Sequence, residues 1–140
     1  MPTETSAPDR QFTVLLSPTR RGARLARLLT CARLDSWGLP SEAAAQIVAE
    51  PAANAATHGR LPGRDFRLEL AVRDDGKLLR IAVTETRDDR LPPASGAPFA
   101  PADDESGRGL LIVGALADRW GVALGPAPRK TVWAELDLVP

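Results

Sequence analysis

Two short segments with alternating apolar and polar residues, joined by a tight turn, constrain the fold more than any other sequence feature. Residues 67–73 and 79–83 each carry an aliphatic side chain at every second position, so each extended segment has one apolar and one polar face. The sequence Asp74-Asp75-Gly76 between them favours a hairpin turn. We therefore expect an antiparallel hairpin with one face buried and the other exposed.

The segment 18–36 has the apolar periodicity of an amphipathic helix. Pro18 lies where a first helical turn tolerates proline, and Gly38 follows the predicted end. We expect one stripe of this helix to face the core and a basic row to face solvent. The stripe and the row consist respectively of Leu25, Leu28, Leu29 and Ala32, and of Arg20, Arg24 and Arg27.

The remaining elements complete a mixed pattern. A second helix is predicted from Ser41 to Thr57, and a third from the apolar spacing of residues 110–120. Short strands are expected at residues 12–16, 121–124 and 131–138. Strands and helices do not alternate along this order, as they would in a parallel doubly wound sheet. The prediction is an α+β fold, a two-layer sandwich of a mostly antiparallel mixed sheet with helices on one face.

The length of 140 residues accommodates one domain. We expect residues 12–140 to form it, after a flexible N-terminal arm at residues 1–11. Residues 87–106 are rich in proline and acidic residues and have no periodicity. A segment of this length without secondary structure in a compact domain is usually functional, so we predict a lid.

The charge balance excludes several classes of function. Eighteen basic and eighteen acidic residues give a net charge of zero, so no overall positive field favours nucleic acid or an anionic membrane. The longest apolar run, residues 110–117, is too short to span a bilayer, and the first residues do not resemble a signal peptide. The single Cys31 cannot form an internal disulfide. A cytoplasmic protein without direct nucleic-acid or membrane contact is expected.

Two polar residues of the second predicted helix form the first chemical motif. Glu50 and Asn54 are four residues apart and therefore share one helix face. An amide oxygen can bind Mg²⁺, and a carboxylate one turn away can accept a proton from a hydroxyl that attacks a phosphate. Taken alone, such a pair is more often a polar helix face in water.

Two further motifs lie on either side of the predicted lid. The sequence Ser-Gly-Arg-Gly-Leu at residues 106–110 places glycines before a helix, where backbone N–H groups can approach a phosphate. Taken alone, a glycine pair of this kind more often reflects ordinary turn chemistry. Glu85 ends a predicted strand just before the lid, where its carboxylate can accept a hydrogen bond from an exocyclic amine such as that of adenine. A strand-end acidic residue is otherwise ordinary surface.

Together these motifs resemble the Bergerat-type ATP-binding fold of the GHKL superfamily. Within it they resemble the small bacterial anti-sigma factor kinases, which inhibit a sigma factor and phosphorylate its anti-anti-sigma antagonist. The resemblance extends over residues 12–138. The sequences similar to the family's N box, adenine-reading box, glycine box and closing strand are residues 50–59, 83–85, 105–113 and 130–136. The last two, in this order and at this distance, are the most specific.

The resemblance implies a serine/threonine kinase that uses ATP and Mg²⁺. The implied partners are an anti-anti-sigma factor and a sigma factor, and a homodimer is the implied assembly. Glu50 corresponds to the general base, Asn54 to the Mg²⁺ ligand and Glu85 to the adenine-binding carboxylate. The other implied nucleotide contacts are Gly107, Arg108, Gly109, Leu110 and Thr131.

Three positions depart from the family pattern. Glu85 replaces an aspartate, Pro51 follows the expected base inside a helix, and Arg129 replaces the glycine expected before the closing strand. An alternative function therefore stays open. It is a catalytically degenerate member of this fold that regulates transcription by sequestering a sigma factor or its antagonist.

Overall fold

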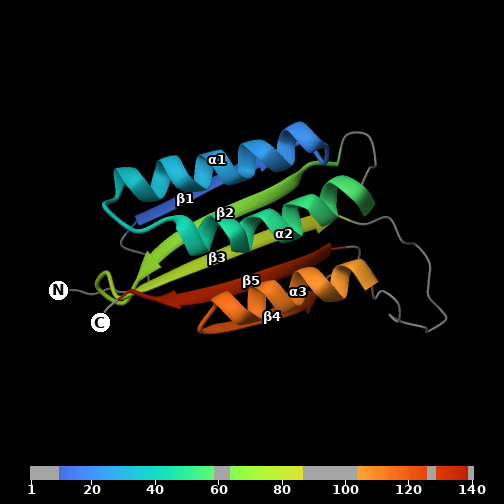
Figure 1. Ribbon diagram of the computed structural model, residues 1–140. Helices are drawn as coiled ribbons and strands as arrows, with labels where there is room; N and C mark the ends of the chain where they lie inside the picture. The colour runs from blue at the N-terminus through green and yellow to red at the C-terminus, as the bar shows by residue number, and fades with distance from the viewer. Residues whose placement is uncertain (1–9, 59–63, 87–103, 126–128, 139–140) are drawn as a thin grey trace.

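The computed structural model describes residues 10–58, 64–86, 104–125 and 129–138. These residues form a single five-stranded sheet with the strand order β1-β2-β3-β5-β4, and each neighbouring pair is antiparallel. Three helices cover one face of the sheet (Figure 1). The elements are β1 (Arg10–Leu16), α1 (Arg20–Ser36), α2 (Glu42–His58), β2 (Phe66–Arg73), β3 (Leu78–Thr86), α3 (Asp104–Leu116), β4 (Arg119–Leu124) and β5 (Arg129–Asp137). The predicted α+β sandwich is confirmed.

The predicted hairpin is the pair β2 and β3. Its register places Val72 opposite Leu79 and Leu68 opposite Val83. In the turn, Asp74 and Asp75 both adopt a φ of 56° and Gly76 a φ of 83°, which is the positive-φ backbone that tight hairpin turns require. The alternating aliphatic residues of both strands are buried beneath the helices.

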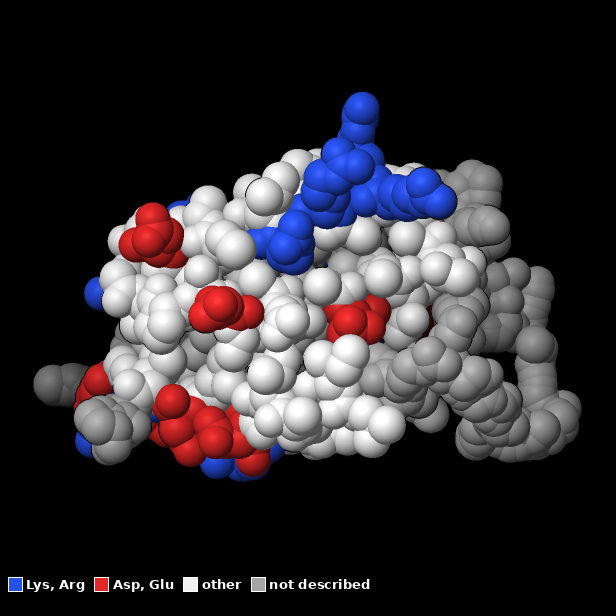
Figure 2. Space-filling model, viewed as in Figure 1, with Lys and Arg blue, Asp and Glu red and all other residues white. Residues whose placement is uncertain are grey.

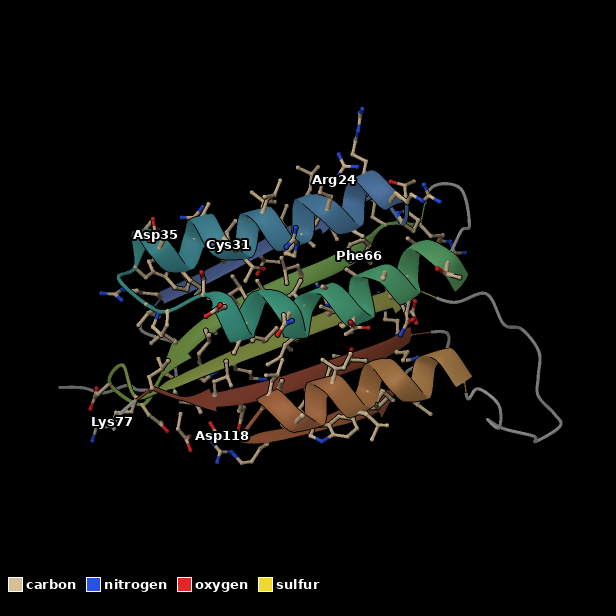
Figure 3. All side chains as sticks on the ribbon, in the orientation of Figure 1. Arg24, Cys31, Asp35, Phe66, Lys77 and Asp118 are labelled. Carbon is tan, nitrogen blue, oxygen red and sulfur yellow. The ribbon has the colours of Figure 1, made fainter. Side chains whose placement is uncertain are left out.

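The core lies between the sheet and the helices. Phe66, at the start of β2, is the largest fully buried side chain and is 1% exposed. Figure 3 shows it in the gap between α1 and α2, and it belongs to the core cluster that the sheet and the helices share. Ile47 and Val48 of α2 are equally buried and belong to the same cluster. α2 is therefore anchored along its length to the strands that carry the candidate site.

The buried face of α1 differs from the prediction. Leu25 is 40% and Leu28 is 51% exposed, whereas the buried positions are Gly22, Ala26, Thr30 and Leu34. Small residues carry little hydrophobic signal in a sequence, yet they let a helix approach its neighbours closely. The buried Thr30 hydroxyl donates to the Ala26 carbonyl oxygen at 2.8 Å, which satisfies it without a water molecule.

The predicted basic row of α1 faces solvent, as expected from its spacing. Arg20, Arg24 and Arg27 are all exposed. Figure 2 shows basic side chains gathered over α1 on the helical face of the molecule, and Figure 3 shows the Arg24 side chain extending away from the helix.

At Gly22 the start of α1 lies close to the backbone of Ser17. A Cβ atom at this position would lie 1.8 Å from the Ser17 carbonyl oxygen, and the Gly22 N–H donates to the capping Thr19 hydroxyl at 3.1 Å. We expect Gly22→Ala to lower the free energy of unfolding by about 1–3 kcal/mol, because the backbone must move. Urea denaturation measures this change. The neighbouring exposed variant Arg21→Ala should stay within about 0.5 kcal/mol of wild type, and equal stability of both variants would contradict the close approach.

Several predicted boundaries require correction. α3 begins at Asp104 and ends at Leu116, so Trp120 belongs to β4 and not to the third helix. Residues 104–106 lie in α3, whereas residues 87–103 of the predicted lid lie outside the described residues. β1 already includes Arg10 and Gln11. Residues 1–9 of the predicted arm lie outside the described residues.

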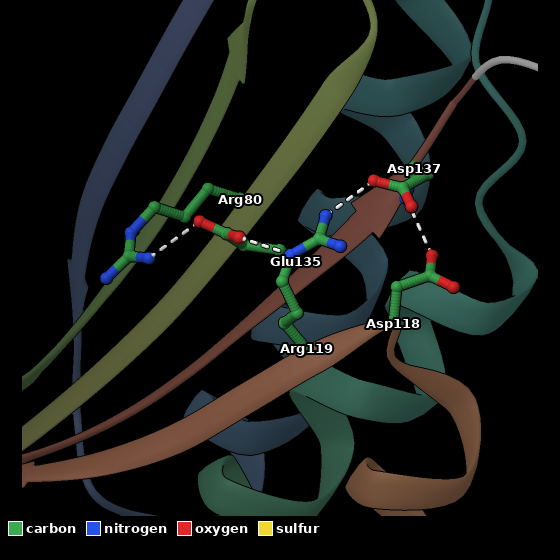
Figure 4. Close-up of polar contacts among 5 residues, drawn as sticks. All are labelled: Arg80, Asp118, Arg119, Glu135 and Asp137. Atoms are coloured by element: carbon green, nitrogen blue, oxygen red, sulfur yellow. Dashed lines mark hydrogen bonds and ion pairs between the residues drawn. The ribbon is translucent and has the colours of Figure 1, made fainter.

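A charged network crosses three strands on the sheet face opposite the helices (Figure 4). The Glu135 carboxylate of β5 accepts hydrogen bonds from Arg80 of β3 at 3.1 Å and from Arg119 of β4 at 2.9 Å. Hydrogen bonds to Asp137 and then Glu135 raise the pKa of the Arg119 guanidinium above its ordinary value. The Asp137 backbone N–H donates to the Asp118 carboxylate at 2.7 Å. These contacts support the register of β5 between its neighbours.

Candidate functional site

A small cavity lies between α2 and the adjacent strands β3 and β5. Its volume is about 10 Å³, which accommodates one water-sized group. The residues that line it are Pro51, Asn54, Val83, Glu85, Lys130 and Val132. The cavity therefore brings together Asn54 and Glu85, two of the predicted site residues, from separate parts of the chain.

α2 positions the first motif. The helix continues through Pro51, which is buried and lines the cavity. Proline has no N–H to donate to the carbonyl oxygen of Ile47, one turn earlier, but α2 runs unbroken from Glu42 to His58. Glu50 and Asn54 are both partly exposed and lie one helical turn apart. Asn54 lines the cavity and Glu50 does not, but both side chains are accessible to a ligand.

Glu85 is buried near the end of β3 and is 6% exposed. Its side chain lies on the same face of the sheet as the core residue Val83, two positions earlier in the strand. Directly opposite on β5 stands Lys130, whose Nζ atom is 3.6 Å from Oε2 of Glu85. The cavity wall therefore carries one negative and one positive group side by side.

Thr131 does not reach this cavity. Because successive side chains of a strand point to opposite faces, Thr131 lies on the other face of the sheet, where its hydroxyl is 2.8 Å from that of Thr84. Lys130, one residue earlier, lines the cavity instead. The sequence already indicated that Lys130 lies on the core face of β5, because it alternates with the apolar residues Val132 and Ala134.

The glycine motif lies in the first turns of α3. Because this helix begins at Asp104, Gly107, Arg108 and Gly109 lie within it and not before it. The first four N–H groups of a helix have no intrahelical acceptor, so Gly107 is the last residue of α3 with such a group, and Arg108 and Gly109 lie beyond it. Leu110, the next residue, is partly buried. Figure 1 places the start of α3 at the same end of the molecule as the end of α2 and the end of β3.

No group of three or more His, Cys, Asp and Glu side chains that could hold a metal ion occurs among the described residues. Asn54, which lines the cavity, has an amide oxygen that could bind a magnesium ion together with ligand phosphates. This donor set suits Mg²⁺, which commonly takes few protein ligands and completes its coordination with phosphates and water. Within the same ranges, no helix combines the length and apolar character needed to cross a membrane.

Comparison with known proteins adds independent findings. The profile of the histidine kinase-like ATPase domain family matches residues 16–135. Among solved structures, the chain is similar to the RsbU and RsbW domains of Rv1364c from Mycobacterium tuberculosis, with a TM-score of 0.66 and 22% identity. That similarity covers 96% of this chain and 34% of the other, and at this identity it supports the fold alone. No curated protein matches the sequence.

Proposed function

Because this chain belongs to the histidine kinase-like ATPase domain family, whose profile covers residues 16–135, we propose that it binds Mg-ATP. The observation that carries the proposal is the convergence of Asn54 and the buried Glu85 on one cavity between α2 and β3. The first turn of α3, with its free N–H groups, lies at the same end of the molecule. The residues proposed to bind adenine, Mg²⁺ and the phosphates thus lie at one end of the molecule.

In the proposed site, Glu85 recognises the base. A carboxylate can only accept hydrogen bonds, so it suits the exocyclic amine of adenine and not the carbonyl oxygen that guanine carries at that position. Burial increases the effect, because two acceptors that face each other repel more strongly in a medium of low dielectric constant than in water. The site should therefore prefer ATP to GTP.

Asn54 and Glu50 act at the triphosphate of ATP in the proposed site. The Asn54 amide oxygen is the candidate ligand for Mg²⁺, which reduces the negative charge of the triphosphate when bound. Glu50, one turn earlier on α2 and partly exposed, is the candidate base that accepts the proton of an attacking hydroxyl. Gly107, in the first turn of α3, is the candidate backbone contact to phosphate.

We further propose that the chain is an anti-sigma regulatory factor. It transfers the γ-phosphoryl group of ATP to a serine or threonine of an anti-anti-sigma partner, and acts as a homodimer that also binds a sigma factor. The proposal draws on the motifs that resemble those of anti-sigma factor kinases, together with the similar fold of a protein with RsbU and RsbW domains. The chain spans about a third of that protein (34%).

One observation favours a second candidate function. Lys130 already stands against Glu85 at the cavity wall, with its Nζ atom 3.6 Å from Oε2 of Glu85, where the base would have to bind. A chain with this site could regulate transcription by binding a protein partner without using nucleotide.

Thermal stability in the presence of ATP separates the two functions. With Mg²⁺ and ATP at about a hundred times its dissociation constant, the free energy of unfolding should rise by about 2.7 kcal/mol. We expect Asn54→Ala to lose the magnesium-dependent part of this stabilisation, since it lacks the metal ligand. The matched control is Gln46→Ala, an exposed polar position on the same helix, which should respond like wild type. No stabilisation of the wild type by Mg-ATP would favour the second function.

A further inference from the structure

We propose that Lys130 reads the nucleotide base together with Glu85, as a hydrogen-bond donor beside an acceptor. The inference rests on the proposed nucleotide site and names a residue that determines its base specificity. Lys130 faces Glu85 across the β3–β5 pair and lines the same cavity.

The position of Lys130 is unusual for a lysine. Its side chain is 19% exposed, and that of Glu85 is 8% exposed. On the same face of the sheet, the nearest neighbours within each strand are Val83, two residues before Glu85, and Val132, two residues after Lys130. Both valines are buried. Burying two charges is costly, and replacing such a pair with apolar residues is often neutral or stabilising. Stability alone therefore does not account for a charged pair at the cavity wall.

The geometry leaves the lysine able to contact a ligand. The 3.6 Å separation of Nζ and Oε2 exceeds the usual length of a hydrogen bond. An ammonium group has three N–H donors, so Lys130 can keep its electrostatic contact with Glu85 and still donate to another acceptor. The pair offers a ligand one acceptor and one donor at neighbouring points.

Adenine has the complementary pattern. Its exocyclic amine is a donor, and a ring nitrogen on each side of that amine, N1 or N7, is an acceptor. Glu85 accepts from the amine while Lys130 donates to one of these nitrogens. Since the cavity of about 10 Å³ holds one water-sized group, it takes an edge group of the base and leaves the ring outside.

The test measures dissociation constants by titration calorimetry with Mg²⁺ present. The ligands are ATP, 1-deaza-ATP and 7-deaza-ATP, of which each analogue lacks one of the two acceptor nitrogens. We expect the wild type to bind one analogue about ten- to a hundredfold more weakly than ATP, because a hydrogen bond to a charged group is lost. Lys130→Met should weaken ATP binding by a similar factor and should bind ATP and that analogue alike.

The matched control is Lys77→Met. Lys77 is the only other lysine of the sequence and is exposed (labelled in Figure 3). It directly precedes β3, and Glu85 and Lys130 pair near the other end of that strand. This variant should discriminate between the three ligands as the wild type does. Circular dichroism of each variant verifies folding, and the wild-type comparison of analogues decides the question even if Lys130→Met does not fold.

The outcomes separate this inference from the proposed function. Equal binding of ATP and both analogues by the wild type would overturn the role of Lys130 and leave nucleotide binding intact. Tighter ATP binding by Lys130→Met would also overturn it, by showing that the lysine competes with the base for Glu85. If neither the wild type nor Lys130→Met binds any of the three nucleotides, the proposed function fails together with the inference.

Discussion

Glu50→Gln is expected to slow phosphoryl transfer by about 10²- to 10⁴-fold while Mg-ATP binding stays close to that of wild type. An amide has nearly the same shape as a carboxylate but cannot accept the proton of the attacking hydroxyl. Glu50 is partly exposed on α2, one turn before Asn54 and outside the cavity that contains Glu85. Loss of the Glu50 carboxylate should therefore affect the transfer of phosphate and not the binding of adenine.

The measurement is the rate at which labelled phosphate passes from ATP to purified candidate anti-anti-sigma proteins encoded in the same genome. Glu42→Gln is the matched control, because Glu42 is the other glutamate of α2 and is exposed in its first turn. It should transfer phosphate at the wild-type rate. Full activity of Glu50→Gln would remove Glu50 from the role of base. Nucleotide binding without transfer to any candidate would point to the binding function.

Phe66→Ala is expected to lower the free energy of unfolding by about 3–5 kcal/mol. Phe66 is 1% exposed and lies at the start of β2 against the helical layer, so its removal leaves a cavity that the surrounding elements fill only in part. Domains of this size are stable by about 5–15 kcal/mol. The loss is thus a large share of the total, and urea denaturation should show it as a lower midpoint.

Leu15→Ala is the control for this substitution. Leu15 lies in the neighbouring strand β1, opposite Arg67, but is 61% exposed. Its truncation should change stability by no more than about 0.5 kcal/mol. A small effect of Phe66→Ala would mean that the interior rearranges around the missing ring, contrary to the packing described.

Local patterns were sufficient for much of the fold. The alternation in β2 and β3 predicted both the hairpin and its buried face, because each depends on neighbouring residues and a turn with positive φ. Glu50 and Asn54 were placed on one helix face for the same reason. The α1 face was predicted wrongly in part: Leu29 packs against the core, but Leu25 and Leu28 are exposed while Ala26 is buried. Close packing favoured small side chains over the most hydrophobic ones.

The sequence by itself determined which residues share a helix face or alternate along a strand, and so it identified Asn54 and Glu85 as candidates. Only the tertiary structure decided that Lys130 of β5 stands against Glu85 of β3. The physical reason is the register of β5 against β3. Side chains alternate with a period of two residues, so a shift of one residue exchanges the two faces of a strand. That register is set by pairing between segments far apart in the chain, including the contacts of Glu135 with Arg80 and Arg119.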